Sequence, residues 1–138
     1  MSEKLNSNKI DHIGIVVPNI EKAIEHYEYT FGIKSSAIKV STIQNVKISH
    51  IDFNNIKIEL IQPLNKTSPI NNFLNKNPNG GLHHLGIEVD NVNKNYKIAQ
   101  ELDLEPIDKP TRGYHGKLLF FLHPKKMMNV LIELISKK

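Results

Sequence analysis

The pattern of apolar and polar residues at the start of the chain predicts a strand followed by a helix. Residues 9–17 carry apolar side chains on both faces of an extended segment, which is typical of a buried strand. Asn19 stands where a helix cap is expected, and apolar residues then recur at helical spacing over 20–31. Gly32 is placed to end that helix, because glycine readily adopts the left-handed conformation found at helix ends.

Further strands are expected in the rest of the first half. Residues 40–53 alternate loosely between apolar and polar side chains, and residues 56–61 form a second strand-like run. Asn54 and Asn55, between the two runs, have the composition of a hairpin turn. An additional short strand is indicated near residues 37–42, so this module has the element order βαβββ.

The next segment predicts a structured connector rather than a flexible linker. Ser68 followed by Pro69 is typical of a helix cap with proline at the first helical position. Ile70, Phe73 and Leu74 would face the body of the protein from this short helix. The run Asn-Pro-Asn-Gly-Gly then breaks the helix.

The second half repeats the same series of elements. Asn91 takes the capping role, and apolar residues at helical spacing follow it over 92–102. Strands are expected at 117–122 and 130–135, after an opening strand that begins at Leu82. The segment between the helix and these strands is punctuated by Pro106 and Pro110.

Together these elements predict an α+β fold of two tandem βαβββ modules. The modules cover about 9–64 and about 82–135, and the connector covers about 65–81. Neither module can bury its apolar faces alone. Side by side they would form one curved, cup-like mixed sheet around a metal site, with the helices outside. At 138 residues, the chain is expected to be a single domain, 1–138.

The repeat extends to ionisable side chains. His12 is followed by Ile-Gly-Ile, and His84, 72 residues later, is followed by Leu-Gly-Ile. Glu59 and Glu133, 74 residues apart, each lie in the sequence Ile-Glu-Leu-Ile. Two histidines and two glutamates at matching positions suit a divalent metal with nitrogen and oxygen ligands.

Strand alternation adds a geometric argument for this site. Gly14 and Gly86 share a face with the histidine two residues before each of them, and they leave room for a ligand there. A lone carboxylate in an apolar strand is costly when it is buried without a partner, and a metal ion would remove that cost. The alternative is that each Glu lies on a solvent-exposed face, where it costs nothing. Mixed nitrogen and oxygen ligands with open positions favour Co, Ni or Mn, and Zn also fits.

The other candidate residues carry weaker arguments. His83 is expected on the face opposite His84, in a structural or supporting role, and His50 either faces the cleft or lies at the surface. Arg112 is a candidate contact for an anion. Of the remaining histidines, His26 is expected to be exposed, His115 to lie in a glycine-rich loop and His123 to lie in a turn.

Composition excludes several classes of protein. The chain has no cysteine, which excludes disulfides and thiolate ligands. The net charge of +4 comes from dispersed lysines and a single arginine, without the basic stripe that nucleic-acid binding requires. This charge would help to attract an anionic substrate. No signal-peptide pattern or membrane-spanning run is present, so a cytoplasmic protein that contacts neither nucleic acid nor membrane is expected.

Four segments resemble a known family. They are Lys-Ile-Asp-His12-Ile-Gly-Ile, Ile-Glu59-Leu-Ile-Gln-Pro-Leu with Ser68-Pro-Ile, Gly-Leu-His-His84 with Glu-Val-Asp-Asn, and Phe-Leu-His-Pro-Lys with Val-Leu-Ile-Glu133-Leu. In this order they resemble the vicinal oxygen chelate superfamily, whose paired βαβββ modules enclose a divalent metal. Within it the chain is most similar to the methylmalonyl-CoA epimerases.

The resemblance implies an activity and roles for residues. It implies a homodimeric isomerase that binds an acyl-CoA substrate and interconverts the 2-epimers of methylmalonyl-CoA through an enolate. His12, Glu59, His84 and Glu133 would hold the metal, and Glu133 and Glu59 would also be catalytic. Some epimerases carry a further catalytic Glu where this chain has Ile48. The alternatives are glyoxalase I and a non-catalytic binding protein of the same fold.

Overall fold

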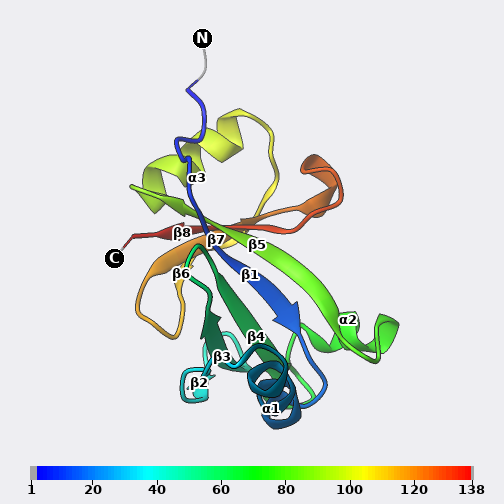
Figure 1. Ribbon diagram of the computed structural model, residues 1–138. Helices are drawn as coiled ribbons and strands as arrows, with labels where there is room; N and C mark the ends of the chain where they lie inside the picture. The colour runs from blue at the N-terminus through cyan, green and yellow to red at the C-terminus, as the bar shows by residue number, and fades with distance from the viewer. Residues whose placement is uncertain (1–2, 138) are drawn as a thin grey trace. The chain divides into compact units, whose positions relative to one another are not determined.

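The computed structural model describes residues 3–137, which fall into two compact units (Figure 1). The first unit comprises residues 12–83, and the second comprises residues 3–11 together with 84–137. Each unit carries one long helix and its own set of strands. The repeated βαβββ order expected from the sequence is therefore confirmed.

The first unit is built from four strands and two helices. Its elements are β1 (Ile10–Val16), α1 (Ile20–Phe31), β2 (Lys39–Ser41), β3 (Val46–Asp52), β4 (Lys57–Pro63) and α2 (Asn71–Lys76). β1 pairs in parallel with β4, whereas β3 pairs antiparallel with both β2 and β4. Phe53 and Ile56 exchange backbone hydrogen bonds of 3.0 and 3.2 Å, which closes the expected two-residue turn.

The second unit repeats this pairing pattern. Its elements are β5 (Gly81–Val89), α3 (Val92–Glu101), β6 (Pro106–Arg112), β7 (Leu118–Leu122), a 3₁₀ turn (Pro124–Lys126) and β8 (Ile132–Ser136). β5 pairs in parallel with β8, and β7 pairs antiparallel with both β8 and β6. In both units a parallel pair therefore joins the first strand to the last.

All eight strands follow one hydrogen-bonded order, β2-β3-β4-β1-β5-β8-β7-β6. β1 and β5 each run from one unit into the other. Within the second unit, the Glu88 N–H donates to the carbonyl of Lys9 at 3.0 Å, and the Lys9 ammonium lies 3.1 Å from the Glu88 carboxylate. Because parallel and antiparallel pairs share one sheet beside separate helices, the predicted α+β class and mixed sheet are confirmed.

The two long helices begin in the same way. The Asn19 side chain accepts a hydrogen bond from the backbone N–H of Lys22, and the Asn91 side chain accepts one from that of Lys94, both at 3.0 Å. Each asparagine thereby satisfies a backbone donor that the first helical turn leaves without a partner. At the other end of α1, Gly32 adopts the left-handed conformation at φ 67° and caps the helix, as expected.

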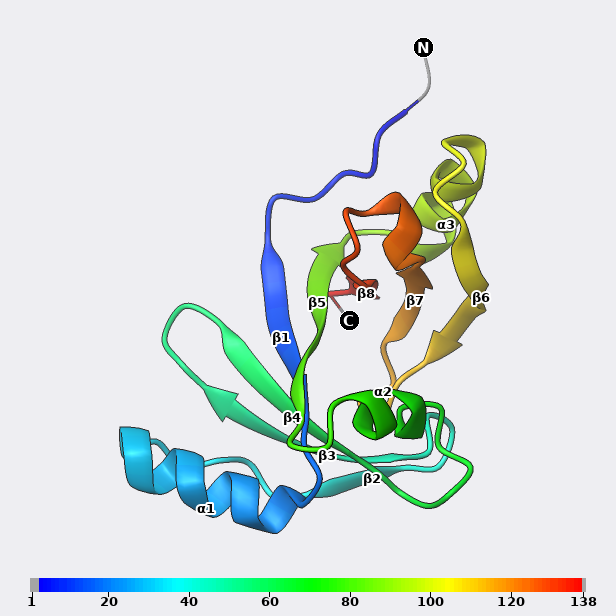
Figure 2. The same ribbon diagram turned by 90° about the vertical axis from the view of Figure 1, so that its right-hand side faces the viewer.

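Each long helix covers one face of its own strands. In the first unit α1 packs over β3 and β4 (Figure 2). There Ile20 meets the buried side chains of Ile51 and Leu60. In the second unit α3 packs over β7 and β8, where Val92 and Ala99 join Phe120 in the core. Since side chains alternate along a strand, residues next to these core positions lie on the opposite face.

Three local features differ from the predictions. The Ser68 side chain does not cap α2, because Pro69 and Ile70 first form a turn and the helix begins only at Asn71. The final strand begins at Ile132 rather than at residue 130. The third difference is β6, which includes Pro106 and Pro110. The βαβββ repeat implies a strand in this segment, but the local pattern assigned no residues to it.

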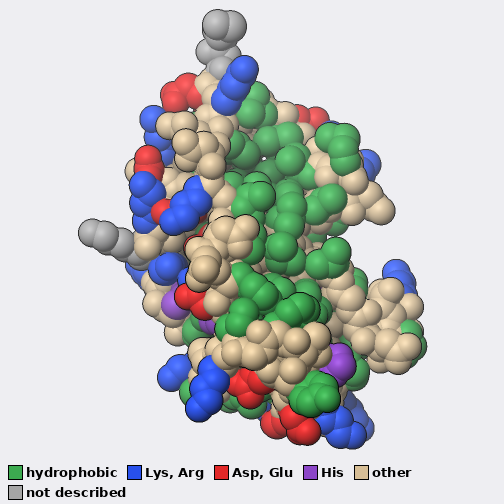
Figure 3. Space-filling view, in the orientation of Figure 1, with side chains coloured by type: hydrophobic (Ala, Val, Ile, Leu, Met, Phe, Trp, Pro, Cys, Tyr) green, Lys and Arg blue, Asp and Glu red, His purple; other side chains and the backbone are tan. Residues whose placement is uncertain are grey.

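On the face seen in Figure 3, hydrophobic side chains lie together in a patch. The exposed large apolar residues of the second unit are Ile10, Ile107, Met128 and Val130. Among the described residues, no helix is long and apolar enough to cross a membrane.

Candidate functional site

In the first unit, the sheet places His12 next to Glu59. β1 and β4 run in parallel, and Gly14 lies opposite Glu59. Because side chains alternate along a strand, His12, two residues before Gly14, lies on the same face of the sheet as Gly14. The His12 Nε2 and the Glu59 Oε2 are 3.8 Å apart. Both residues are buried, with 2% and 7% of their surface exposed.

The second unit contains the same arrangement. β5 and β8 run in parallel with Gly86 opposite Glu133, and His84 lies two residues before that glycine. The His84 Nε2 and the Glu133 Oε1 are 3.4 Å apart. These residues are 5% and 4% exposed. The sequence repeat therefore produces two His–Glu pairs of matching geometry.

Burial decides between the two interpretations of the glutamates. A solvent-facing Glu was the alternative for each strand, but both Glu59 and Glu133 lie inside. Burying a carboxylate is costly unless hydrogen bonds, an opposite charge or a metal ion compensate it. The glycine opposite each carboxylate carries no side chain, which leaves space beside the carboxylate group. Both pairs thus have the features of ligand-binding positions.

His50 makes a further contact with Glu59 of the first pair. It lies directly opposite Glu59 in the β3–β4 hairpin, and its Nε2 is 3.1 Å from the Glu59 Oε2. The sequence carried the signal for this contact. Once Asn54 and Asn55 form a two-residue turn, counting outward along both strands pairs residue 50 with residue 59.

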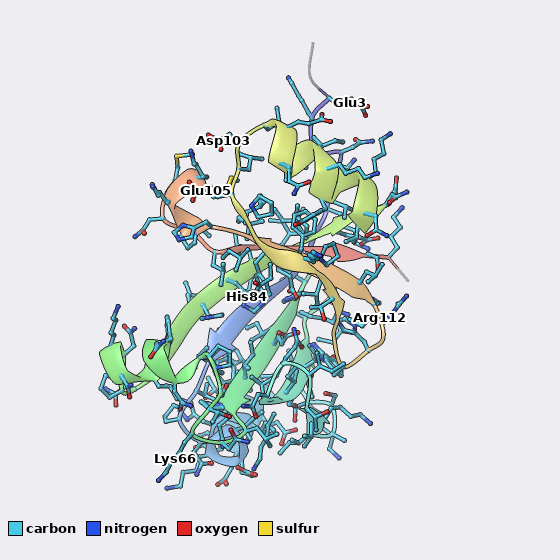
Figure 4. The ribbon with its side chains drawn as sticks, turned by 180° about the vertical axis from the view of Figure 1, so that it is seen from behind. Glu3, Lys66, His84, Asp103, Glu105 and Arg112 are labelled. Carbon is cyan, nitrogen blue, oxygen red and sulfur yellow. The ribbon has the colours of Figure 1, made fainter. Side chains whose placement is uncertain are left out.

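The other candidate residues have structural contacts. His83 packs edge-on against Phe73 of α2, with ring centres 5.3 Å apart. Arg112 is exposed, and its guanidinium donates to the carbonyl of Gly116 at 2.6 Å. Figure 4 shows Arg112 at the end of β6, whereas His84 lies inside on β5.

The remaining histidines also have the roles expected from the sequence. His26 is exposed on α1. His115 and His123 each accept a hydrogen bond at Nδ1 from the backbone N–H two residues on, at 3.0 Å, in a loop and in a turn.

The donor set fits a divalent metal ion. His12, His84 and Glu133 are three buried side chains of the types that hold such an ion. Two donor atoms each about 2.1 Å from one ion lie roughly 3.0–3.4 Å apart at octahedral to tetrahedral angles. The 3.4 Å separation between His84 and Glu133 matches neighbouring ligands. The separation between His12 and Glu59, 3.8 Å, is longer than this range, and Glu59 is not one of the three grouped residues.

The sequence of the chain matches a known family over most of its length. Residues 11–121 match the Glyoxalase/Bleomycin resistance protein/Dioxygenase superfamily. The chain belongs to this superfamily. This confirms the resemblance that the four sequence segments indicate.

Several relatives are named as epimerases, whereas two from Bacillus subtilis are uncharacterised. A mitochondrial methylmalonyl-CoA epimerase of Dictyostelium discoideum is 38% identical over 135 residues, which is 97% of this chain and 81% of that protein. An ethylmalonyl-CoA/methylmalonyl-CoA epimerase of Cereibacter sphaeroides is 37% identical over 128 residues, 91% of this chain and 96% of that one. A solved methylmalonyl-CoA epimerase in complex with methylmalonyl-CoA and NH4+ has a TM-score of 0.88 at 28% identity and covers 95% of both chains.

Proposed function

We propose that this protein is a divalent-metal-dependent epimerase that interconverts the 2-epimers of methylmalonyl-CoA or of a closely related 2-substituted malonyl thioester. The observation that carries the proposal is the duplicated buried His–Glu pair, His12 with Glu59 and His84 with Glu133. The identity of 37–38% to named epimerases, over more than nine-tenths of this chain, supports the choice of substrate.

We propose that the two pairs hold one ion between them. His12, Glu59, His84 and Glu133 would be its ligands, and Co, Ni or Mn would suit this donor set best, with Zn also accepted. A bound divalent ion supplies a Lewis acid that stabilises negative charge on the thioester oxygen. The buried position of the donors supports this role, because it keeps water away from charges that must interact strongly.

The two glutamates would move the proton. Glu133 would accept the proton from C2 as the C2–H bond breaks, which leaves the substrate as its enolate. Glu59 would enter the reaction protonated and give that proton to the other face of C2, so that a C–H bond forms with inverted configuration. Proton exchange with water would then restore both glutamates. The reverse direction exchanges the two roles. The reaction consumes no oxidant or second substrate, since one proton leaves and one returns.

The test is proton exchange at C2. Purified protein is first analysed for bound metal, stripped with a chelator and reloaded with Co. Proton NMR in D2O then follows the loss of the C2 proton of methylmalonyl-CoA and the appearance of the other epimer. We expect both with metal and neither after stripping. Failure of the metal-loaded protein to exchange the C2 proton contradicts the proposal.

The same samples distinguish the alternatives. Isomerisation of a glutathione hemithioacetal in place of C2 exchange would indicate glyoxalase I. Binding of the CoA ester without exchange would indicate a non-catalytic binding protein. A homodimer and a cytoplasmic location stay predictions, which sedimentation and cell fractionation can check.

A further inference from the structure

The hydrogen bond between His50 and Glu59 carries an inference about how the site is held in place. The Glu59 Oε2 lies 3.1 Å from the Nε2 of His50 and 3.8 Å from the Nε2 of His12. Only the first distance is that of a hydrogen bond. When the Glu59 carboxylate is ionised it can only accept, so in that state His50 donates from Nε2.

The second unit lacks this donor at the matching position. β3 places His50 opposite Glu59, and β7 places Phe121 opposite Glu133. A phenyl ring has no N–H or O–H to offer a carboxylate. Phe121 instead meets the ring of His84 edge-on, with centres 5.9 Å apart. The duplicated pairs therefore agree in their histidine, glutamate and glycine but differ in this cross-strand neighbour.

We propose that His50 is a positioning residue that holds the Glu59 carboxylate in the orientation in which it binds the metal ion. The inference rests on the proposed function, since it requires Glu59 to be a ligand. The last torsion of a Glu side chain is soft and has broad minima, so a free carboxylate samples many orientations. A hydrogen bond to one oxygen restricts that rotation. Partners of this kind, outside the ligand shell, typically affect metal affinity or activity by about 10–100-fold.

The burial of the pair supports a positioning role. The Glu59 side chain is 10% exposed and that of His50 is 18% exposed, so the hydrogen bond lies mostly out of water. In such a place it competes with few solvent molecules and is stronger than at the surface. His50 also lies on a paired strand rather than on a loop, which fixes its backbone.

The experiment measures Co affinity of the stripped protein by calorimetry. His50→Phe places in the first unit the residue that the second unit already has, and we expect it to weaken Co binding about 10–100-fold. His50→Gln keeps an N–H at about the same distance from the backbone, and we expect it to restore most of the affinity. His26→Phe, the same change at an exposed helix position, should bind Co like the natural protein.

Each result has a definite meaning. If the natural protein fails to bind Co, the proposed function is wrong. If it binds Co and His50→Phe binds equally well, the proposed function stands and the positioning role is wrong. Equal weakening in His50→Phe and His50→Gln also overturns it, since the hydrogen bond would then not matter. Thermal unfolding of the stripped variants monitors folding, and His50→Leu, which also lacks a donor but is smaller, supplies the measurement if His50→Phe unfolds.

Discussion

The two units carry the same ionisable pair in different surroundings. In the first, Glu59 faces an imidazole across the hairpin at 3.1 Å, and in the second, Glu133 faces the ring of Phe121. The distance between the histidine and the glutamate also differs, at 3.8 Å in the first unit and 3.4 Å in the second. A duplicated module thus preserves the donors and varies what lies beside them.

This difference suggests separate duties for the two glutamates. A carboxylate with a fixed hydrogen bond is well suited to hold an ion in one geometry. Phe121, opposite Glu133, makes no hydrogen bond that would have to break before this carboxylate turns toward a proton. Glu59 would then contribute more to binding the metal, and Glu133 more to removing the proton.

The largest effect is expected from removing a histidine ligand. His84→Ala should abolish tight metal binding and turnover while the fold remains intact, because a ligand is lost but little core volume is opened. Metal content and circular dichroism check both parts. His83→Ala is the control, since His83 packs on Phe73. Equal loss of metal from both variants would contradict the assignment of these neighbours.

The next largest effect is expected from a variant that separates the role of Glu133 as a base from its role as a metal ligand. Glu133→Gln should lower the rate of C2 exchange by about 10²–10⁴-fold, because the amide cannot accept the proton. Its oxygen can still approach the ion, so the fall in metal affinity should be far smaller. Rate and affinity are measured on the same preparation, by NMR and calorimetry. A loss of affinity as large as the loss of rate would show that Glu133 acts mainly as a ligand.

Glu59→Gln is the matched variant in the other unit. It should retain exchange from one face of C2 while inversion stops, so that one epimer takes up deuterium without forming the other. Full epimerisation by this variant would mean that another group, with His50 as the nearest candidate, returns the second proton.

A smaller effect is expected from making the two units alike. Phe121→His places an N–H donor opposite Glu133, as His50 stands opposite Glu59. We expect the exchange rate to fall by roughly tenfold, because a hydrogen bond to the charged carboxylate weakens it as a base. Co affinity should fall much less. An unchanged rate in the NMR assay would mean that the aromatic neighbour has no part in the difference between the units.

The main elements could be predicted because their signals are local, and the repeat singled out four ionisable residues as candidate ligands. Asn19 and Asn91 mark helix starts, and the repeated Ile-Glu-Leu-Ile marks two strands. The repeat then linked positions far apart in the chain, which periodicity within one segment cannot do. Whether His12 and the other three residues are buried still required the structure.

The residues of β6 could not be assigned from the local pattern, although the repeat implies a strand there, because its two prolines are tolerated only at the edge of a sheet. It is the last strand in the order, so one side of it needs no donors for a neighbouring strand. Pro106 and Pro110 are tolerated there, and Asp108, at φ 56°, interrupts the register between Ile107 and Thr111. A sequence pattern cannot show that a strand will lie at an edge.

The smallest effect is expected from removing the helix caps, which tests whether the two modules also match at the start of their helices. Asn19→Ala and Asn91→Ala each remove a side-chain oxygen that accepts a backbone N–H at 3.0 Å, and each should cost about 1 kcal/mol of unfolding free energy. Urea unfolding of the metal-free protein measures both, so that the metal does not mask the difference. Around α1, Gln62 also accepts the N–H of Ile20 at 2.8 Å. This second acceptor at the start of α1 should make the Asn19 variant the milder of the two, and a clearly larger loss for Asn19→Ala would contradict this account of the caps.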